Sequence, residues 1–233
     1  MKHLKEIASA IIIAAIILGI FYYQTNKQTQ TVKVVGYASK EYESDIIKWN
    51  VTLATIQNSQ AQGYEVLSHE LSKFKDFLSK NNLNPHELEI MPNYSYGNFN
   101  RDGIITSYNF EQTVAITVSD TTRFSEIEML SLDMTKLIKA GISIRNSTVS
   151  YYISALPELK IEIISDATKD ARERALQVAK TTGTKLGKLL NGRVGVFQIT
   201  EPLSVEVQSY GIYSTHTRKK QISVTFSGEF QLK

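Results

Sequence analysis

Four carboxylates have the spacing that paired acid–base or cation chemistry would need. They form two pairs, Glu158 with Glu162 and Asp166 with Asp170. Each pair is four residues apart on a predicted helix, so both of its carboxylates lie on one face. We expect this face to be solvated, because two exposed carboxylates bind a cation only weakly. The pairs therefore indicate no acid–base site.

The residues that usually bind metals are scattered along the chain. There is no cysteine, which excludes disulfides, thiol catalysis and cysteine-ligated metal sites. The four histidines lie far apart in sequence and near no carboxylate cluster with ligand spacing. They are His3, His69, His86 and His216. We predict no metal site and no cofactor.

Motifs for nucleophilic catalysis or phosphate binding are absent from the sequence. No G-x-S-x-G element occurs. The "GTKLG" segment at Gly183–Gly187 lacks the G-K-[ST] ending of a phosphate-binding loop, and Gly192 and Gly195 form no dinucleotide fingerprint. We predict no catalytic residue and a protein that is not an enzyme. A hydrolase with an unrecognised site is the last-ranked alternative.

The charge balance argues against a nucleic-acid partner. The chain has 26 Lys and Arg against 23 Asp and Glu, a formal net charge of +3. Nucleic-acid-binding domains concentrate basic residues on one face, whereas the basic residues here are mixed with acids. We therefore predict no binding to nucleic acid.

Two turn-rich segments combine aromatic and basic residues in the way that protein contact surfaces do. The candidate interaction residues in these predicted loops are Tyr94, Tyr96, Phe99, Tyr210, Tyr213 and Arg218. Hairpin tips that pack on themselves are the alternative. The basic run Arg218–Lys220 could also lie on anionic lipid, although three charges are few.

Two residues outside these segments have structural predictions. Trp49 is predicted to be a core residue. Asp45 is predicted to be a solubilising residue at a strand edge, and pairing of Asp45 with a basic residue is the alternative.

The N-terminal segment predicts a membrane anchor. Residues 7–23, "IASAIIIAAIILGIFYY", contain no charge and lie at the short end of the length that spans a bilayer. Lys2 and Lys5 precede them and aromatic residues close them, which suits a helix with a cytoplasmic N-terminus. A cleaved signal peptide is the alternative, but no small-x-small site follows. We divide the chain into an anchor and linker, residues 1–31, and an extracytoplasmic domain, residues 32–233.

Hydrophobic periodicity predicts an alternation of strands and helices in the domain. The expected order is β-β-α-β-β-α-β-α-β-β, with helices over residues 59–81, 120–141 and from Pro157. The strands are expected at 32–39, 44–56, 87–96, 106–118, 147–155, 193–201 and 220–232. Hairpins mixed with helical crossovers indicate an α+β fold, a mostly antiparallel sheet with helices packed on one face.

The densest run of charge is "DARERALQVAKTTGTKLGKLL", from Asp170 to Leu190. Its small apolar stripe would let a helix lie close to a sheet, Gly183 would end the helix, and "TKLGKLL" would turn the chain into the next strand. The stripe is Ala171, Ala175, Val178 and Ala179. We interpret the segment as a structural joint and not as an active site.

Three elements together resemble the SIMPL-domain family, also called the domain-of-unknown-function 541 family. They are "VVGYAS" with Gly36 and Ala38, the D-A-x-x-x-A-x-x-x-A helix followed by G-x-K-L-G, and the closing strand "KQISVTFSGEFQL". The helix motif is matched by Asp170, Ala171, Ala175, Ala179, Gly183, Lys185, Leu186 and Gly187. The Pro-Asp that often precedes the second strand is absent, and the single anchor with "YESDIIKW" looks like the single-anchor bacterial branch of the family.

This resemblance implies location more than activity. The family has no agreed enzymatic activity and no assigned catalytic residues. Its bacterial members are linked loosely to envelope or oxidative stress, and self-assembly is plausible for the family. We therefore expect a single-pass inner-membrane protein with a periplasmic domain whose partner is itself, as a homo-oligomer, or another envelope protein. A small-molecule or peptide-binding module that senses stress is the alternative.

Overall fold

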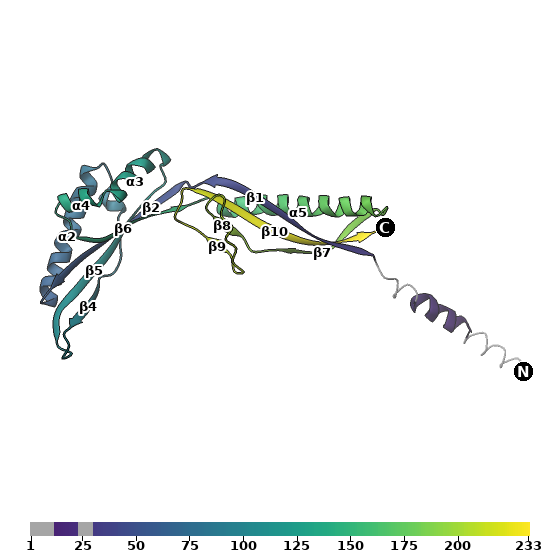
Figure 1. Cartoon of the computed structure of the whole chain (residues 1–233), viewed down its shortest axis with the longest axis horizontal. Coiled ribbons are helices and arrows are strands. Elements are labelled where there is room, and N and C mark those ends of the chain that lie inside the picture. The colour runs from purple at the N-terminus through teal and green to yellow at the C-terminus, as the bar shows by residue number, and fades with distance from the viewer. Residues whose placement is uncertain (1–11, 23–29) are drawn as a thin grey trace, which may run out of the picture. The chain divides into compact units, whose positions relative to one another are not determined.

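The computed structural model describes residues 12–22 and 30–233, and these residues form an α+β structure with antiparallel-rich sheets, as predicted (Figure 1). The chain divides into two compact units. Unit 1 consists of Met1–Ala38, Ile164–Gly195 and Val224–Lys233, and unit 2 of Ser39–Ile163 and Val196–Ser223. Strand β1 (Thr31–Glu43), helix α5 (Leu156–Thr181) and strand β10 (Lys219–Leu232) contribute residues to both units.

Unit 2 contains a five-stranded antiparallel sheet in the order β3-β5-β2-β6, with β4 also paired to β5. Its strands are β2 (Ile46–Gln57), β3 (Glu89–Ile90), β4 (Tyr94–Phe99), β5 (Ile105–Val118) and β6 (Ile144–Tyr152). The strand predicted over 44–56 is confirmed by β2, in which Trp49, Val51 and Leu53 are buried while the residues between them are half-buried. One face of this sheet therefore forms the core.

Helices cover that core face of the sheet. They are α2 (Gln60–Lys80), α3 (Phe124–Leu132) and α4 (Met134–Lys139), and Figure 1 shows them gathered on one side of β2, β5 and β6. The Trp49 ring meets Phe74 of α2 edge-on at 5.7 Å, and Trp49 donates a hydrogen bond from Nε1 to Ser147 Oγ at 2.9 Å. The prediction that Trp49 is a core residue is confirmed.

Unit 1 contains parts of β1 and β10, strand β7 (Leu186–Val194) and most of α5. The small stripe on α5 lies directly against β1. A Cβ added to Gly36 would lie 2.2 Å from the Ala167 carbonyl oxygen and 2.4 Å from the Ala171 nitrogen. Both alanines are fully buried. The expectation that alanines bring this helix close to the sheet is confirmed, although Val178 of the predicted stripe is 39% exposed.

Several predicted boundaries were wrong. The "TKLGKLL" segment is not a turn, because β7 begins at Leu186 and pairs antiparallel with β10. The predicted strand over 193–201 is split between the end of β7 and β8 (Gln198–Thr200). Gly195 lies between these strands, and a Cβ added there would lie 2.4 Å from Thr225 Oγ1, so the Thr225 side chain would have to move to admit one. The short β9 (Ile212–Tyr213), which pairs in parallel with β8, was not predicted.

The predicted single sheet was also wrong, since β1, β10, β8, β9 and β7 form a second five-stranded sheet. The alternation of apolar and polar residues identifies a strand but not the strands it pairs with, which explains this error.

The predicted helix over 120–141 is broken at Asp133, whose ψ of 73° is not helical. Aspartate favours such breaks because its side chain competes for backbone hydrogen bonds. A 3-10 turn (Thr121–Arg123) precedes α3, and Asp120 caps it, accepting from the Thr122 N–H at 3.0 Å.

The N-terminal prediction falls partly on residues that the structure does not describe. Residues 12–22 are helical, whereas residues 7–11 and 23 of the predicted anchor, and residues 24–29 of the predicted linker, lie outside the described residues. Among the described helices, none has both the length and the apolar character needed to cross a bilayer.

Candidate functional site

The first group of predicted interaction residues lies in a strand and not in a loop. Tyr94, Tyr96 and Phe99 belong to β4, which pairs with Ile105–Glu111 of β5. The strand predicted over 87–96 already contained Tyr94 and Tyr96, but Gly97 and Asn98 suggested that the turn began before Phe99. The actual turn is at Asn100–Gly103, where Asn100 Oδ1 accepts two backbone N–H groups. Among the described strands β4 has no partner on its other side, so it is an edge strand.

The side chains of β4 remain largely open to solvent. Tyr94 and Phe99 are each 64% exposed and Tyr96 is 38% exposed. The rings of Tyr94 and Tyr96 lie 5.8 Å apart. Ile104 and Ile105 at the start of β5 are also exposed. β4 and its turn therefore carry a run of exposed aromatic and aliphatic side chains beside unpaired backbone groups.

One ion pair fixes the position of Tyr96. Arg145 of β6 reaches across the sheet to the Glu111 carboxylate, and both terminal nitrogens of Arg145 lie 3.4 Å from the Tyr96 hydroxyl. The hydrogen bond to Tyr96 and the charge of Glu111 raise the pKa of Arg145. Tyr96 is thus held in place, while Tyr94 and Phe99 have no hydrogen bond or ion pair in the described part of the chain beyond their strand pairing.

The second group of predicted residues divides into exposed and partly buried members. Tyr210 is 82% exposed, whereas the hydroxyl of Tyr213 accepts a long hydrogen bond from the Ile153 N–H at 3.4 Å. Burial raises the pKa of Tyr213, and the nearby Asp45 carboxylate acts in the same direction. Tyr213 therefore has a structural contact, and Tyr210 is the more accessible of the two.

The basic run Arg218–Lys220 is not the solvent-facing lipid strip considered above. The Arg218 guanidinium lies 3.7 Å from Glu43 and 5.1 Å from the centre of the Phe124 ring. Lys220 is fully buried, and its ammonium donates to the carbonyl oxygens of Ser214 at 2.6 Å and Thr217 at 2.9 Å. Of the three residues only Lys219 is exposed. It begins β10, in which alternate residues point inward, so the next residue, Lys220, is buried.

Lys220 is the residue that sequence reasoning missed. Its signal was available, because Lys220 precedes Ile222 and Val224 by steps of two and so shares their buried face. A lysine on the buried face of a strand is unexpected unless its ammonium has partners inside the fold. Burial lowers its pKa, while the Glu201 carboxylate acts in the opposite direction. A fully buried amine of this kind cannot contact a substrate, so we do not assign it a catalytic role.

Asp45 is not the free strand-edge residue that was predicted. It precedes β2, and its two carboxylate oxygens accept from the Ser154 N–H at 2.8 Å and from the Ser154 hydroxyl. Burial alone would raise the pKa of Asp45, but these hydrogen bonds outweigh it and the pKa is lowered. The carboxylate thereby fixes the chain between β6 and α5.

Replacing Asp45 with alanine is expected to destabilise the protein by about 1 kcal/mol, as for the loss of other intramolecular hydrogen bonds. Because its pKa is lower folded than unfolded, its contribution is present above the ordinary carboxyl pKa of 3.8 and is lost as pH falls through the lowered value. Urea unfolding at neutral and acidic pH should show the difference from wild type shrinking at low pH. Asp102→Ala, in the exposed hairpin turn, is the control, and an equal loss there would contradict the role of Asp45.

Asp170 likewise has specific partners rather than a solvated face. Its Oδ2 accepts from the Tyr37 N–H of β1 at 2.8 Å and from Arg174 Nε at 2.8 Å. These bonds, the one from Tyr37 first, lower its pKa. Among the described strands β1 lies at the edge of its sheet, so Asp170 satisfies a backbone donor that none of these strands covers. The Asp-Ala pair at 170–171 therefore attaches α5 to β1 through one hydrogen bond and one close contact.

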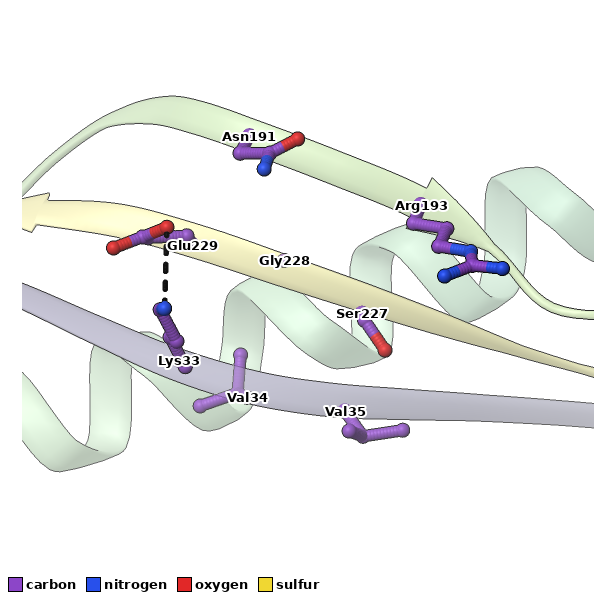
Figure 2. A pocket seen from close by; sticks show the side chains of 8 residues that line it. All are labelled: Lys33, Val34, Val35, Asn191, Arg193, Ser227, Gly228 and Glu229. Atoms are coloured by element: carbon purple, nitrogen blue, oxygen red, sulfur yellow. Dashed lines mark ion pairs between the residues drawn. The ribbon is translucent and has the colours of Figure 1, made fainter.

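An open groove lies on unit 1 across β1, β10 and β7 (Figure 2). It has a volume of about 450 Å³ and is lined by Lys33, Val34, Val35, Asn191, Arg193, Ser227, Gly228 and Glu229. Lys33 lies 3.7 Å from Glu229, and this ion pair crosses between β1 and β10. The Arg193 side chain has no ion-pair partner among the described residues. This groove differs from the closed apolar pocket expected of a small-molecule sensor.

No group of three or more His, Asp or Glu residues that could hold a metal occurs in the described residues. His69, His86 and His216 are described, and His3 lies outside the described residues. The groups with shifted pKa values have structural partners, and several of them in unit 2 are neighbours: Asp45 acts on the pKa of Tyr213, Glu201 acts on that of Lys220, and the Lys220 ammonium lies 5.8 Å from the centre of the Tyr213 ring.

Comparison with known protein families identifies the family to which this chain belongs. The SIMPL family, described as a protein of unknown function (DUF541), matches residues 32–230. The match begins in β1, ends in β10 and includes the contact of Gly36 with Ala167 and Ala171. A search of curated proteins finds no match. Since the family covers most of the chain, this protein belongs to the SIMPL (DUF541) family.

Proposed function

We propose that this chain is a membrane-anchored protein of the bacterial envelope whose extracytoplasmic SIMPL domain self-assembles, and that it is not an enzyme. The observation that carries the proposal is the open edge of β4 in unit 2. Its exposed aromatic residues and unpaired backbone groups suit strand pairing with another chain.

A second copy of the same chain is the occupant that this edge fits best. The β4 sequence "YSYGNF" contains no charged residue, although charges commonly protect exposed edges from pairing. Two such strands can pair antiparallel about a two-fold axis, which is the commonest symmetry of homo-oligomers. Uncharged strands place no like charges opposite one another in that arrangement. The exposed Tyr94 and Phe99 side chains would then gain cross-strand partners.

The anchor part of the proposal rests on the sequence. Residues 7–23 are uncharged, Lys2 and Lys5 precede them, and aromatic residues end them. This arrangement leaves the SIMPL domain outside the cytoplasm. A link to envelope or oxidative stress is what the family resemblance suggests. The anchor would be refuted if mass spectrometry showed that the mature protein begins after Tyr23.

Native mass measurement of the full chain in detergent tests self-assembly. We expect an oligomer, and we expect Tyr94→Ser with Phe99→Ser to weaken it by at least about tenfold, as loss of aromatic contacts at an interface centre does. Leu132→Ser with Ile161→Ser is the matched control, because both residues are more exposed than Tyr94 and Phe99 and neither belongs to β4. A wild-type protein that is strictly monomeric, or a control as disruptive as the double variant, would contradict the proposal.

Ligand binding is the second candidate function, and the groove of Figure 2 is the observation in its favour. The Arg193 guanidinium, which has no ion-pair partner among the described residues, lines the groove together with Asn191 and Ser227 and suits a small polar anion. Such a ligand would raise the melting temperature of the wild type but not of Arg193→Gln. A screen of anions without any shift would remove this candidate.

A further inference from the structure

The charge of the chain is divided unevenly between its two units. From residue 30 onward, unit 1 contains nine Lys and Arg residues against four Asp and Glu residues, whereas unit 2 contains fourteen against eighteen. The small net charge of +3 therefore hides a basic unit 1 and an acidic unit 2. The basic unit is also the one whose β1 continues directly from the N-terminal segment.

Hydrogen bonds show which end of unit 1 adjoins that segment. The Leu232 N–H donates to the Gln30 carbonyl at 2.8 Å, so the start of β1 lies beside the end of β10. Lys185 and Lys233 exchange two backbone hydrogen bonds of 2.8 Å, which adds the start of β7 to the same end. The Thr184 N–H donates to the Ala179 carbonyl, which adds the last turn of α5. Figure 1 shows these ends of β1, α5 and β10 together.

Three lysines form what we call the basic end of unit 1: Lys180, Lys185 and Lys233. All three are exposed, and in the described part of the chain no ion pair involves any of them. Lys188 follows on β7 and is also exposed. The nearest acidic residue on β10, Glu229, already lies close to Lys33 at 3.7 Å. Several positive charges are therefore left uncompensated at one end.

We propose that the basic end of unit 1 docks on the anionic headgroups of the membrane that holds the N-terminal helix. This inference rests on the proposed anchor. Residue 22 ends the described helix and residue 30 begins the described domain, so the chain between them reaches no more than about 30 Å even when fully extended. Clusters of lysines held this close to a bilayer are attracted by anionic lipid. Unit 2, which carries net negative charge, would not be attracted to the same surface.

The experiment uses the full chain in bilayers of phosphatidylcholine, with or without phosphatidylglycerol. The absence of native cysteine allows a single fluorophore at Thr181→Cys, an exposed position at the end of α5. A quencher attached to lipid headgroups then reports contact with the membrane. We expect quenching to rise with phosphatidylglycerol and to fall with added salt, because salt screens these charges.

Charge-removing variants identify the residues responsible. Each lysine near an anionic surface favours docking by roughly fivefold, so Lys180→Gln, Lys185→Gln and Lys233→Gln together should abolish the lipid dependence. The matched control removes three exposed lysines from unit 2, with Lys80→Gln, Lys139→Gln and Lys219→Gln, and should leave it unchanged. Melting curves of both triple variants would verify that each one folds.

The outcomes separate the two proposals. Release of the protein from bilayers by alkaline carbonate would overturn the anchor, and the docking inference with it. Retention in the bilayer with quenching that is independent of phosphatidylglycerol would overturn the docking inference alone. Equal loss of quenching in both triple variants would also overturn it, because the effect would then depend on total charge and not on the basic end.

Discussion

Replacing Gly36 with alanine is expected to destabilise the protein by about 3 kcal/mol or more, at the upper end of the range for overpacked sites. The new methyl group would lie 2.2 Å from the Ala167 carbonyl oxygen and 2.4 Å from the Ala171 nitrogen. Both atoms belong to the backbone of α5, so no side-chain rotation can relieve the clash. The helix would have to move away from β1.

Movement of α5 would also disturb the contacts beside Gly36. Ala171, which is fully buried against β1, would be partly uncovered, and the 2.8 Å hydrogen bond from the Tyr37 N–H to Asp170 would lengthen. The loss therefore combines steric strain with reduced burial and a weakened hydrogen bond. Urea unfolding, followed by circular dichroism, measures it.

Gly97→Ala is the matched control for this prediction. Gly97 is also a strand glycine, but its added Cβ would meet only the Ile105 side chain at an ordinary distance of 3.4 Å. We expect a change within about 0.5 kcal/mol, as for other tolerated surface substitutions. If Gly36→Ala were as mild as Gly97→Ala, the close contact between α5 and β1 would be wrong.

The contact at Gly36 also shows which features of the fold could be predicted from the sequence and which could not. The small apolar stripe of Ala171, Ala175, Val178 and Ala179 predicted a helix lying close to a sheet, because backbone can approach backbone only where side chains are small. The partner strand could not be predicted from periodicity alone. It lies more than 120 residues away in sequence, and the resemblance to the SIMPL family named Gly36 and Asp170 in two separate elements without indicating that they meet.

The candidate interaction residues were harder to predict, and the reasons differ. Tyr94, Tyr96 and Phe99 were identified as exposed aromatics, but Gly97 and Asn98 led us to end the predicted strand at Tyr96 and to place Phe99 in the turn, whereas β4 continues to Phe99. Arg218 was taken for a solvent-facing cation, although it pairs with Glu43 from a distant strand. Pairing between distant residues leaves no local pattern, so composition alone assigns such side chains to the surface.

Replacing Lys220 with methionine is the second change expected to have a large effect. Methionine keeps a straight apolar side chain of similar size but leaves the Ser214 and Thr217 carbonyl oxygens without their buried donor. Unsatisfied buried polar groups cost about 1 to 3 kcal/mol each. We expect a loss of about 3 kcal/mol at neutral pH, and Lys219→Met, at the exposed neighbouring position, should be nearly neutral.

The loss of unfolding free energy in Lys220→Met should also depend on pH. The burial of Lys220 determines the direction of this dependence. Because burial lowers the pKa of Lys220 below its ordinary value of 10.5, the unfolded chain binds more protons than the folded one between the two values. The free energy of unfolding of the wild type therefore rises with pH in that window. When Lys220 is neutral, its amine still has two hydrogens, so it can donate to both the Ser214 and the Thr217 carbonyl oxygens.

The variant lacks this titration, so the difference in unfolding free energy between wild type and Lys220→Met should widen as pH rises toward 10.5. Urea titrations of both proteins at several pH values from neutral upward measure that difference directly. A constant difference would mean that Lys220 titrates alike in the folded and unfolded chains. A difference that narrows would mean that the charged ammonium is the form that the folded protein favours, with Glu201 outweighing burial.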